Sequence, residues 1–210
     1  MDIVERISGL AGYGARWVMW LLVLLSIVAV AIIIERAVLF FSSRDDVVKL
    51  RAEIRRLLGA GEFRQALRCL EGSPSFEARI AAAGLECASP DGADERMQSE
   101  QELARLDMER RLAVLGTLGN NAPFVGLLGT VIGIVRAFRE LEQAGAQVSA
   151  GLMAEIGEAL IATAIGLLVA LPAVAAFNGF QRLVRSRLGQ AEALRHEVLS
   201  YLKGGAHGAS

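Results

Sequence analysis

The sequence lacks the short motifs by which many small enzymes and metal-binding proteins are recognised. It contains no G-x-x-x-x-G-K-[ST] phosphate loop, no H-E-x-x-H and no pair of cysteines at zinc-binding spacing. Histidine is scarce: His196 and His207 are the only two, and both lie near the C-terminal end. No internal repeat with a period of 20–50 residues is visible. We therefore expect no enzyme, no metal site and no bound cofactor.

An excess of either charge is also absent, since 22 Lys and Arg stand against 23 Asp and Glu, for a net charge of −1. Nothing in this balance indicates a nucleic-acid partner. Hydrophobic residues make up 53% of the 210-residue chain and charged residues 21%, and the mean hydropathy is +0.42. This mixture is typical of a membrane protein with a substantial aqueous part.

Three uncharged runs are long enough to cross a bilayer, at 17–34, 112–135 and 159–181. A helix rises about 1.5 Å per residue, so roughly 20 apolar residues cross a hydrocarbon core of about 30 Å. The first run reaches this length with the apolar residues that follow Glu35 and Arg36. Its position and length, with only a weak "AVA" inside it, favour a span over a cleaved signal peptide. The sequence predicts three transmembrane helices.

Lysine and arginine are distributed unevenly around these runs. Segment 1–16 holds two and segment 136–158 holds two, whereas 37–111 holds twelve and the tail from Arg182 holds five. Because cytoplasmic segments are rich in Lys and Arg, the middle segment and the tail are expected in the cytoplasm and the N-terminus outside. Cys69 and Cys87 are then expected as reduced thiols.

We predict an all-α membrane protein whose three transmembrane helices extend into a cytoplasmic helical bundle. Its expected segments are a periplasmic interfacial helix (1–16), transmembrane helix 1 (17–38), a cytoplasmic helical region (39–111), transmembrane helix 2 (112–136), a periplasmic loop (137–157), transmembrane helix 3 (158–181), and a cytoplasmic helix with a flexible tail (182–210).

Within the cytoplasmic segments, apolar periodicity predicts that the first helix continues through 44–58. Shorter helices are expected at 62–71 and 76–86, and "SPDGAD" (89–94) is expected to form a turn. From about Asp94 one helix is expected to run straight through the second span. The third span is likewise expected to continue into the tail.

Small residues form a stripe on each of the last two spans, following the i, i+3, i+4 spacing of one helix face. On the second span the stripe contains Thr130 together with Gly116, Gly119, Pro123, Gly126 and Gly133. On the third span it contains Thr163 together with Ala159, Gly166 and Ala170. Such residues allow close helix packing in lipid, which explains most of the glycines without any further role. Pro123 and Pro172 each remove a backbone donor, and we expect a helix kink at Pro172.

Three polar residues of these spans have both a structural and a functional interpretation. A threonine in a span usually bonds back to its own helix, so Thr130 and Thr163 are ambiguous. Glu158 either is an exposed carboxylate at a helix N-terminus or faces a water-filled cavity, as ionisable groups at membrane depth tend to do. No carboxylate lies at the middle of any span, so a complete proton relay would need a titratable group from another chain.

The motifs "APFVGLLGTVIGIVRAF" and, after a short loop, "IGEALIATAIGLLVALPAVAAFN" resemble those of the MotA/TolQ/ExbB proton-channel family, on its TolQ/ExbB side. The resemblance covers about 112–178 and implies an inner-membrane, multi-pass protein with a periplasmic N-terminus and a cytoplasmic C-terminus. It implies that Thr130, Thr163 and Glu158 line the proton pathway, and that the small residues pack along the pore face.

The resemblance also implies partners and a function. The chain is expected to form a homopentamer around a dimer of a single-span ExbD/TolR-like protein. This motor would convert proton-motive force into mechanical work for outer-membrane transport, envelope maintenance or gliding. We interpret the thin stripe on the second span as room for the partner's helix. The alternatives are a structural scaffold without ion conduction and, with less support, a solute transporter acting alone.

Overall fold

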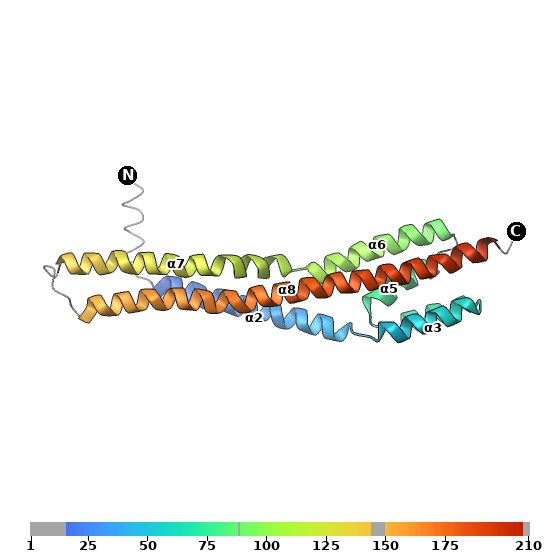
Figure 1. Ribbon diagram of the computed structural model, residues 1–210, viewed down its shortest axis with the longest axis horizontal. Coiled ribbons are helices and arrows are strands. Elements are labelled where there is room, and N and C mark those ends of the chain that lie inside the picture. The colour runs from blue at the N-terminus through green and yellow to red at the C-terminus, as the bar shows by residue number, and fades with distance from the viewer. Residues whose placement is uncertain (1–15, 88, 144–149, 208–210) are drawn as a thin grey trace. The chain divides into compact units, whose positions relative to one another are not determined.

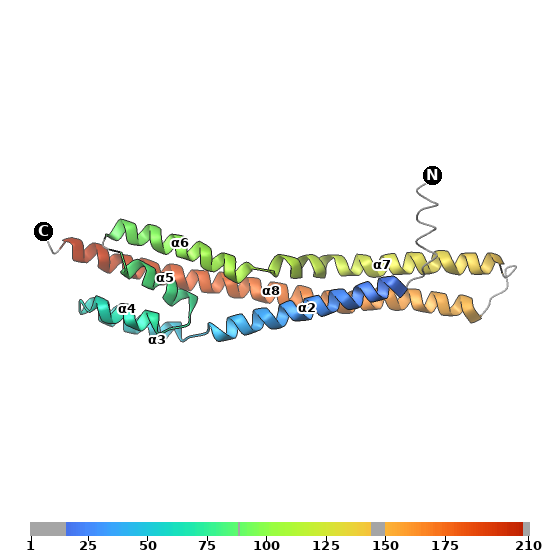
Figure 2. The ribbon, with the colours of Figure 1, turned by 180° about the vertical axis from the view of Figure 1, so that it is seen from behind.

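The computed structural model describes residues 16–87, 89–143 and 150–207, and within these ranges every regular element is a helix. The helices are α2 (Arg16–Ser42), α3 (Val47–Gly59), α4 (Phe63–Glu71), α5 (Phe76–Leu85), α6 (Pro90–Glu109), α7 (Leu112–Gln143) and α8 (Ala150–His207) (Figures 1 and 2). Three helical stretches, containing α2, α7 and α8, are long and apolar enough to cross a membrane. The prediction of an all-α protein with three spans is confirmed. The expected interfacial helix 1–16 lies outside the described residues, apart from Arg16.

The chain divides into two compact units. The first, here called the apolar unit, comprises 16–34 and 111–178 of the described residues. The second, called the charged unit, comprises 35–110 and 179–207. Helices α2 and α8 each contribute one part to each unit.

In the apolar unit, α2, α7 and the first half of α8 run side by side (Figures 1 and 2). Their shared core is apolar throughout and consists of Val18, Leu22, Ala122, Ile132, Val169 and Ala170. Large apolar side chains such as Leu24, Leu128 and Leu168 are exposed on the outside. Lipid or other chains are the natural environment for such a surface, because an apolar area this extensive is unusual on a soluble monomer.

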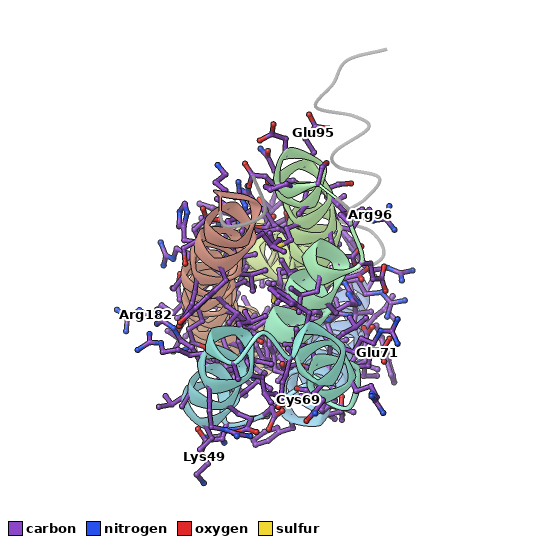
Figure 3. The ribbon with its side chains drawn as sticks, turned by 90° about the vertical axis from the view of Figure 1, so that its right-hand side faces the viewer. Lys49, Cys69, Glu71, Glu95, Arg96 and Arg182 are labelled. Atoms are coloured by element: carbon purple, nitrogen blue, oxygen red, sulfur yellow. The ribbon has the colours of Figure 1, made fainter. Side chains whose placement is uncertain are left out.

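In the charged unit, α4 packs against α3 and α5, and α5 packs against α6. The C-terminal part of α2 meets the middle of α8 where Phe40 stacks on Phe180, with ring centroids 5.6 Å apart. The long polar side chains of Lys49, Arg96 and Arg182 project away from the helices (Figure 3). The unit therefore carries charged side chains on its outside, as is typical of a helical bundle in water.

Cys69 and Cys87 lie in the charged unit and are both free thiols, as expected from the sequence. Burial raises the pKa of the Cys69 thiol, and the nearby carboxylates of Glu53 and Asp45 act in the same direction. Since the thiolate is the reactive form, Cys69 is a poor nucleophile at neutral pH.

The prediction of one unbroken helix from residue 94 to 138 is wrong, because the helix is interrupted at Arg110 and Arg111. Arg111 has a φ of 63°, in the left-handed region, and it separates α6 from α7. In an unbroken helix the Asp107 carbonyl would accept from the Arg111 N–H, four residues on. Instead the buried Arg36 side chain donates to that carbonyl from Nη1 at 2.8 Å. Arg36 thus caps the end of α6, which the apolar pattern alone did not indicate.

Side-chain caps also account for two other differences from the sequence-based helix bounds. The first helix does not continue through 44–58: α2 ends at Ser42, and Asp46 caps a new helix by accepting from the Lys49 N–H at 3.2 Å. Similarly, 89–94 is not a turn. Ser89 accepts from the Gly92 N–H at 3.2 Å, Pro90 occupies the first turn, and α6 begins there.

The last two spans are longer helices than expected. Helix α7 continues to Gln143 and α8 begins at Ala150, so much of the expected loop 137–157 is helical, while 144–149 lies outside the described residues. Helix α8 runs through Pro172 and into the expected flexible tail as far as His207, which confirms the continuation of the third span. A kink at Pro172 stays a prediction.

Lowering the pH is expected to weaken the ion pairs between α3 and α8 and so to reduce the stability of the fold. Glu197 of α8 binds Arg51 at 2.5 Å and also Arg55, both from α3. Burial raises the pKa of Glu197, but the hydrogen bonds from Arg55 and Arg51 outweigh it and leave that pKa below the ordinary glutamate range. The two ion pairs of Glu197 therefore stabilise the fold at neutral pH, and this contribution is lost as the pH falls through the lowered pKa of Glu197. Thermal unfolding of the detergent-solubilised protein across an acid pH series checks this, and the Glu197→Gln variant should lose less stability in acid than the wild type.

Candidate functional site: the α7–α8 seam

The small residues of α7 and α8 meet along one line, here called the seam. A Cβ added at Gly133 would lie 2.5 Å from the Ala159 Cβ, and one added at Gly129 would lie 2.7 Å from the Ala162 Cβ. At Gly126 the added atom would lie 2.8 Å from the Ala162 carbonyl oxygen. Contacts below 3.0 Å exclude even a methyl group unless the helices move apart. The backbones of α7 and α8 are therefore as close as glycine permits.

The seam corrects one interpretation made from the sequence. The side chains of the α7 stripe were expected to be small because a partner's helix passes along it. The face containing Gly119, Gly126 and Gly133 instead lies against α8 of the same chain, where Gly119 approaches Val174 and Gly133 approaches Ala159. Helix packing, the other explanation considered, accounts for these contacts.

The remaining small residues of the two stripes lie on or beside the seam. Gly116 approaches the Phe177 ring, and a Cβ there would be 3.1 Å from it. Gly166 lies against the Ala122 carbonyl and Gly126. Ala159 and Ala170 are buried, Pro123 is half-buried and Pro172 is exposed. A place for any of them on a pore face stays a prediction.

Thr130 and Thr163 have different hydrogen-bonding environments. Thr130 is buried, and its hydroxyl donates to the Leu127 carbonyl of its own helix at 2.6 Å. The Thr163 hydroxyl oxygen is buried too, yet it bonds to no atom among the residues that the structure describes. A buried hydroxyl without a partner costs free energy, so such groups usually serve a further interaction. Of the two threonine hydroxyls, that of Thr163 makes no hydrogen bond within the described residues, whereas that of Thr130 already donates one.

Glu158 lies on α8, five residues before Thr163. Its side chain is 29% exposed, and its Oε1 lies 3.9 Å from Nε of Arg16 at the start of α2. This separation is too long for a hydrogen bond, and the Arg16 side chain is 83% exposed, so the pair is loose. Glu158 is therefore accessible and only weakly held.

A second pair at this end of the seam was missed in the sequence analysis. Arg136 of α7 lies 3.1 Å from the Glu155 carboxylate of α8, whose side chain is only 19% exposed. The sequence did contain a signal: Glu155, Ala159 and Ala162 follow the i, i+4, i+7 spacing of a single face. That spacing extends the α8 stripe by one turn to Glu155.

The architecture and the seam together define a class of protein: a helical, multi-pass membrane protein whose spans meet through small residues and carry a few polar groups. A model of the MotA/TolQ/ExbB proton channel family matches residues 73–193, more than half of the sequence. The chain belongs to this family. It is a multi-pass protein of the inner membrane, and membership of a channel family confirms that it is not an enzyme.

Curated relatives are similar either over most of the chain or over about half of it. The biopolymer transport protein ExbB of Neisseria meningitidis is 29% identical over 191 residues, which cover 85% of this chain and 87% of that protein. The ExbB protein of Aquifex aeolicus is 38% identical over 106 residues, covering 50% of this chain and 71% of that protein. The Xanthomonas campestris ExbB is 39% identical over 99 residues, covering 47% and 39%.

Proposed function

We propose that this chain is the channel-forming subunit of an inner-membrane motor that uses proton-motive force to drive biopolymer transport across the cell envelope. It acts with a single-span ExbD/TolR-like partner, whose dimer occupies the centre of a homopentamer of this chain. The N-terminus faces the periplasm, and the charged unit lies in the cytoplasm, as the distribution of Lys and Arg favours. Family membership and the names of the relatives support this proposal.

The observation that carries the proposal is the buried Thr163 hydroxyl, which has no partner in the described part of the chain. A hydroxyl both donates and accepts hydrogen bonds without carrying charge. It can therefore hold water, or a partner's carboxyl group, within the membrane. Thr130, whose hydroxyl already donates to Leu127, retains acceptor capacity and is the weaker of the two candidates.

The protonatable group at the centre of the membrane comes from the partner in this mechanism. The middle of each span of this chain carries no Asp or Glu, so its own residues can orient a proton carrier but cannot replace one. Glu158, accessible near the start of the third span, attracts protons towards Thr163. Each proton crossing 100 mV releases about 2.3 kcal/mol, enough to favour one direction of a stepwise movement of the partner.

Co-purification from native membranes in mild detergent tests the assembly. We expect a small protein with one apolar helix that contains an aspartate, present at well below one copy per subunit of this chain. Recovery of a homo-oligomer alone in several detergents would contradict the motor.

Thr163→Val is expected to abolish energy-dependent activity while leaving assembly intact, because valine has the same shape but no hydroxyl. The wild-type hydroxyl has no partner among the described residues, so its loss should cost little stability. Activity is measured as proton entry into cells that contain the chain and the co-purified partner. Thr163→Ser, which keeps the hydroxyl, is the control and should retain activity. Full proton entry by Thr163→Val would contradict the proposed function, because the Thr163 hydroxyl carries it.

A structural scaffold is the second candidate, because the glycine seam and the local bond of Thr130 are both ordinary packing features. In a scaffold, Thr163→Val and Glu158→Ala should both leave every energy-dependent activity unchanged. These two variants therefore distinguish the candidates without knowledge of the system that is driven.

A further inference from the structure

We infer that Glu155, paired with Arg136, is a second proton-binding carboxylate of the pathway, located at the end of the seam nearest the connection between α7 and α8. This inference rests on the proposed function and adds to it a titratable group that neither the sequence motifs nor the comparisons indicate.

The position of Glu155 is the first argument. Glu155, Ala159, Ala162 and Gly166 follow one face of α8, and the last three of them contact the glycines of α7. The Glu155 carbonyl oxygen itself would lie 3.5 Å from a Cβ added at Gly133. A carboxylate therefore occupies the next place on a line otherwise made of alanine and glycine. Packing alone would favour another small residue there.

The environment of the carboxylate is the second argument. Arg136 lies 3.1 Å from Oε1, whereas Oε2 is buried and accepts no hydrogen bond from any residue in the described ranges. A buried carboxylate oxygen without a donor is costly. Protonation of Oε2 turns this acceptor into an O–H donor, which water or a hydroxyl can accept. The structure thus combines one charge-stabilised oxygen with one oxygen available to a proton.

The order of groups along α8 is the third argument. Glu155, Glu158 and Thr163 follow one another, and eight residues of helix from Glu155 to Thr163 correspond to about 12 Å. In the proposed step a hydronium ion gives its proton to Oε2, and the pair with Arg136 weakens as the carboxyl becomes neutral. Release of that proton to water on the Thr163 side restores the carboxylate and the pair.

Other charges lie around this end of the seam and belong to the same electrostatic environment. Two of these charged residues are on α7. Glu140 lies against Gly151 at the start of α8, and Arg139 interacts with another group. Glu158 and Arg16 form the looser pair one turn along α8. Compared with Glu158, Glu155 is less exposed and has the closer cation, 3.1 Å against 3.9 Å. Glu155 is therefore the more shielded of the two carboxylates.

The test measures proton entry into cells that contain the chain and its co-purified partner, as cytoplasmic acidification after the medium is stepped to a series of acid pH values. Glu155→Gln is expected to slow entry on the order of tenfold or more and to flatten its pH dependence. Glu155→Asp, which stays titratable, should keep a pH-dependent rate. Arg136→Gln, which removes the cation next to the carboxylate, should change the pH profile of proton entry. The matched control is Glu142→Gln, an exposed carboxylate of α7 that should change nothing.

A purely structural ion pair predicts different results. Glu155→Gln and Arg136→Gln would then reduce the assembled amount but leave the pH profile of the assembled protein unchanged, which would overturn the inference. If Glu155→Gln does not assemble, the profiles of Glu155→Asp and Arg136→Gln decide between the two outcomes. Thr163→Val in the same assay separates the two proposals. Loss of entry in Thr163→Val with normal entry in Glu155→Gln contradicts only this inference, whereas normal entry in Thr163→Val contradicts the proposed function.

Discussion

Replacing Glu77 by alanine is expected to destabilise the charged unit by about 3–5 kcal/mol, because it leaves a buried arginine without its counter-charge. The Glu77 side chain of α5 is 0% exposed, and that of Arg187 on α8 is 9% exposed. Arg187 Nη1 donates to both carboxylate oxygens at 3.2 Å. This pair joins two helices through residues that lie 110 positions apart in the sequence, so its loss affects the whole unit.

The same physics predicts that removal of both charges is far less harmful than removal of one. A double variant with Glu77→Met and Arg187→Leu leaves no unpaired buried charge and should recover most of the lost stability. Thermal unfolding in detergent compares the stability of the wild type, Glu77→Ala and the double variant. Equal destabilisation by the single and double variants would show that Glu77 and Arg187 do not act as a pair. A stability of Glu77→Ala close to that of the wild type would show that Arg187 is solvated once its partner is removed.

The helices were predictable from the sequence because their apolar patterns are long and regular, and α4 and α5 began and ended close to the expected residues. The errors lie where a side chain competes with helix continuation. Asp46 and Ser89 each cap a helix, and Arg36 takes the Asp107 carbonyl from the Arg111 N–H. Periodicity describes which face of a helix is apolar, and it contains no information about such caps.

The candidate site was predictable only in part, for a related reason. The spacing of the small residues located the seam, but a helical wheel does not identify which neighbour occupies a face. Packing was expected to explain most of the glycines, but the stripe as a whole was interpreted as room for a partner's helix, although α8 of the same chain lies against it. Glu155 was overlooked because Arg136, its counter-charge, is nineteen positions away on another helix. Pairings of this kind depend on tertiary structure.

Gly126→Ala is expected to separate α7 from α8 locally and to destabilise the apolar unit by about 1–3 kcal/mol, towards the upper end of that range. The added Cβ would lie 2.8 Å from the Ala162 carbonyl oxygen, 3.0 Å from the Thr163 Cα and 3.2 Å from the Gly166 Cα. All three are backbone atoms, so no side chain can rotate to make room. The helices themselves must move, and the displacement falls at Thr163.

Gly157→Ala is the matched control, because Gly157 also lies within α8 but no atom of the described chain would come within 4 Å of its Cβ. Alanine favours the helix over glycine, so this variant should be unchanged or more stable by up to about 1 kcal/mol. Unfolding of both variants in detergent gives the stability difference, and proton entry in cells gives the functional one. Because the displacement reaches Thr163, we expect Gly126→Ala to lose proton entry even in protein that assembles. Stability and proton entry equal to those of Gly157→Ala would mean that α7 and α8 do not pack closely at Gly126.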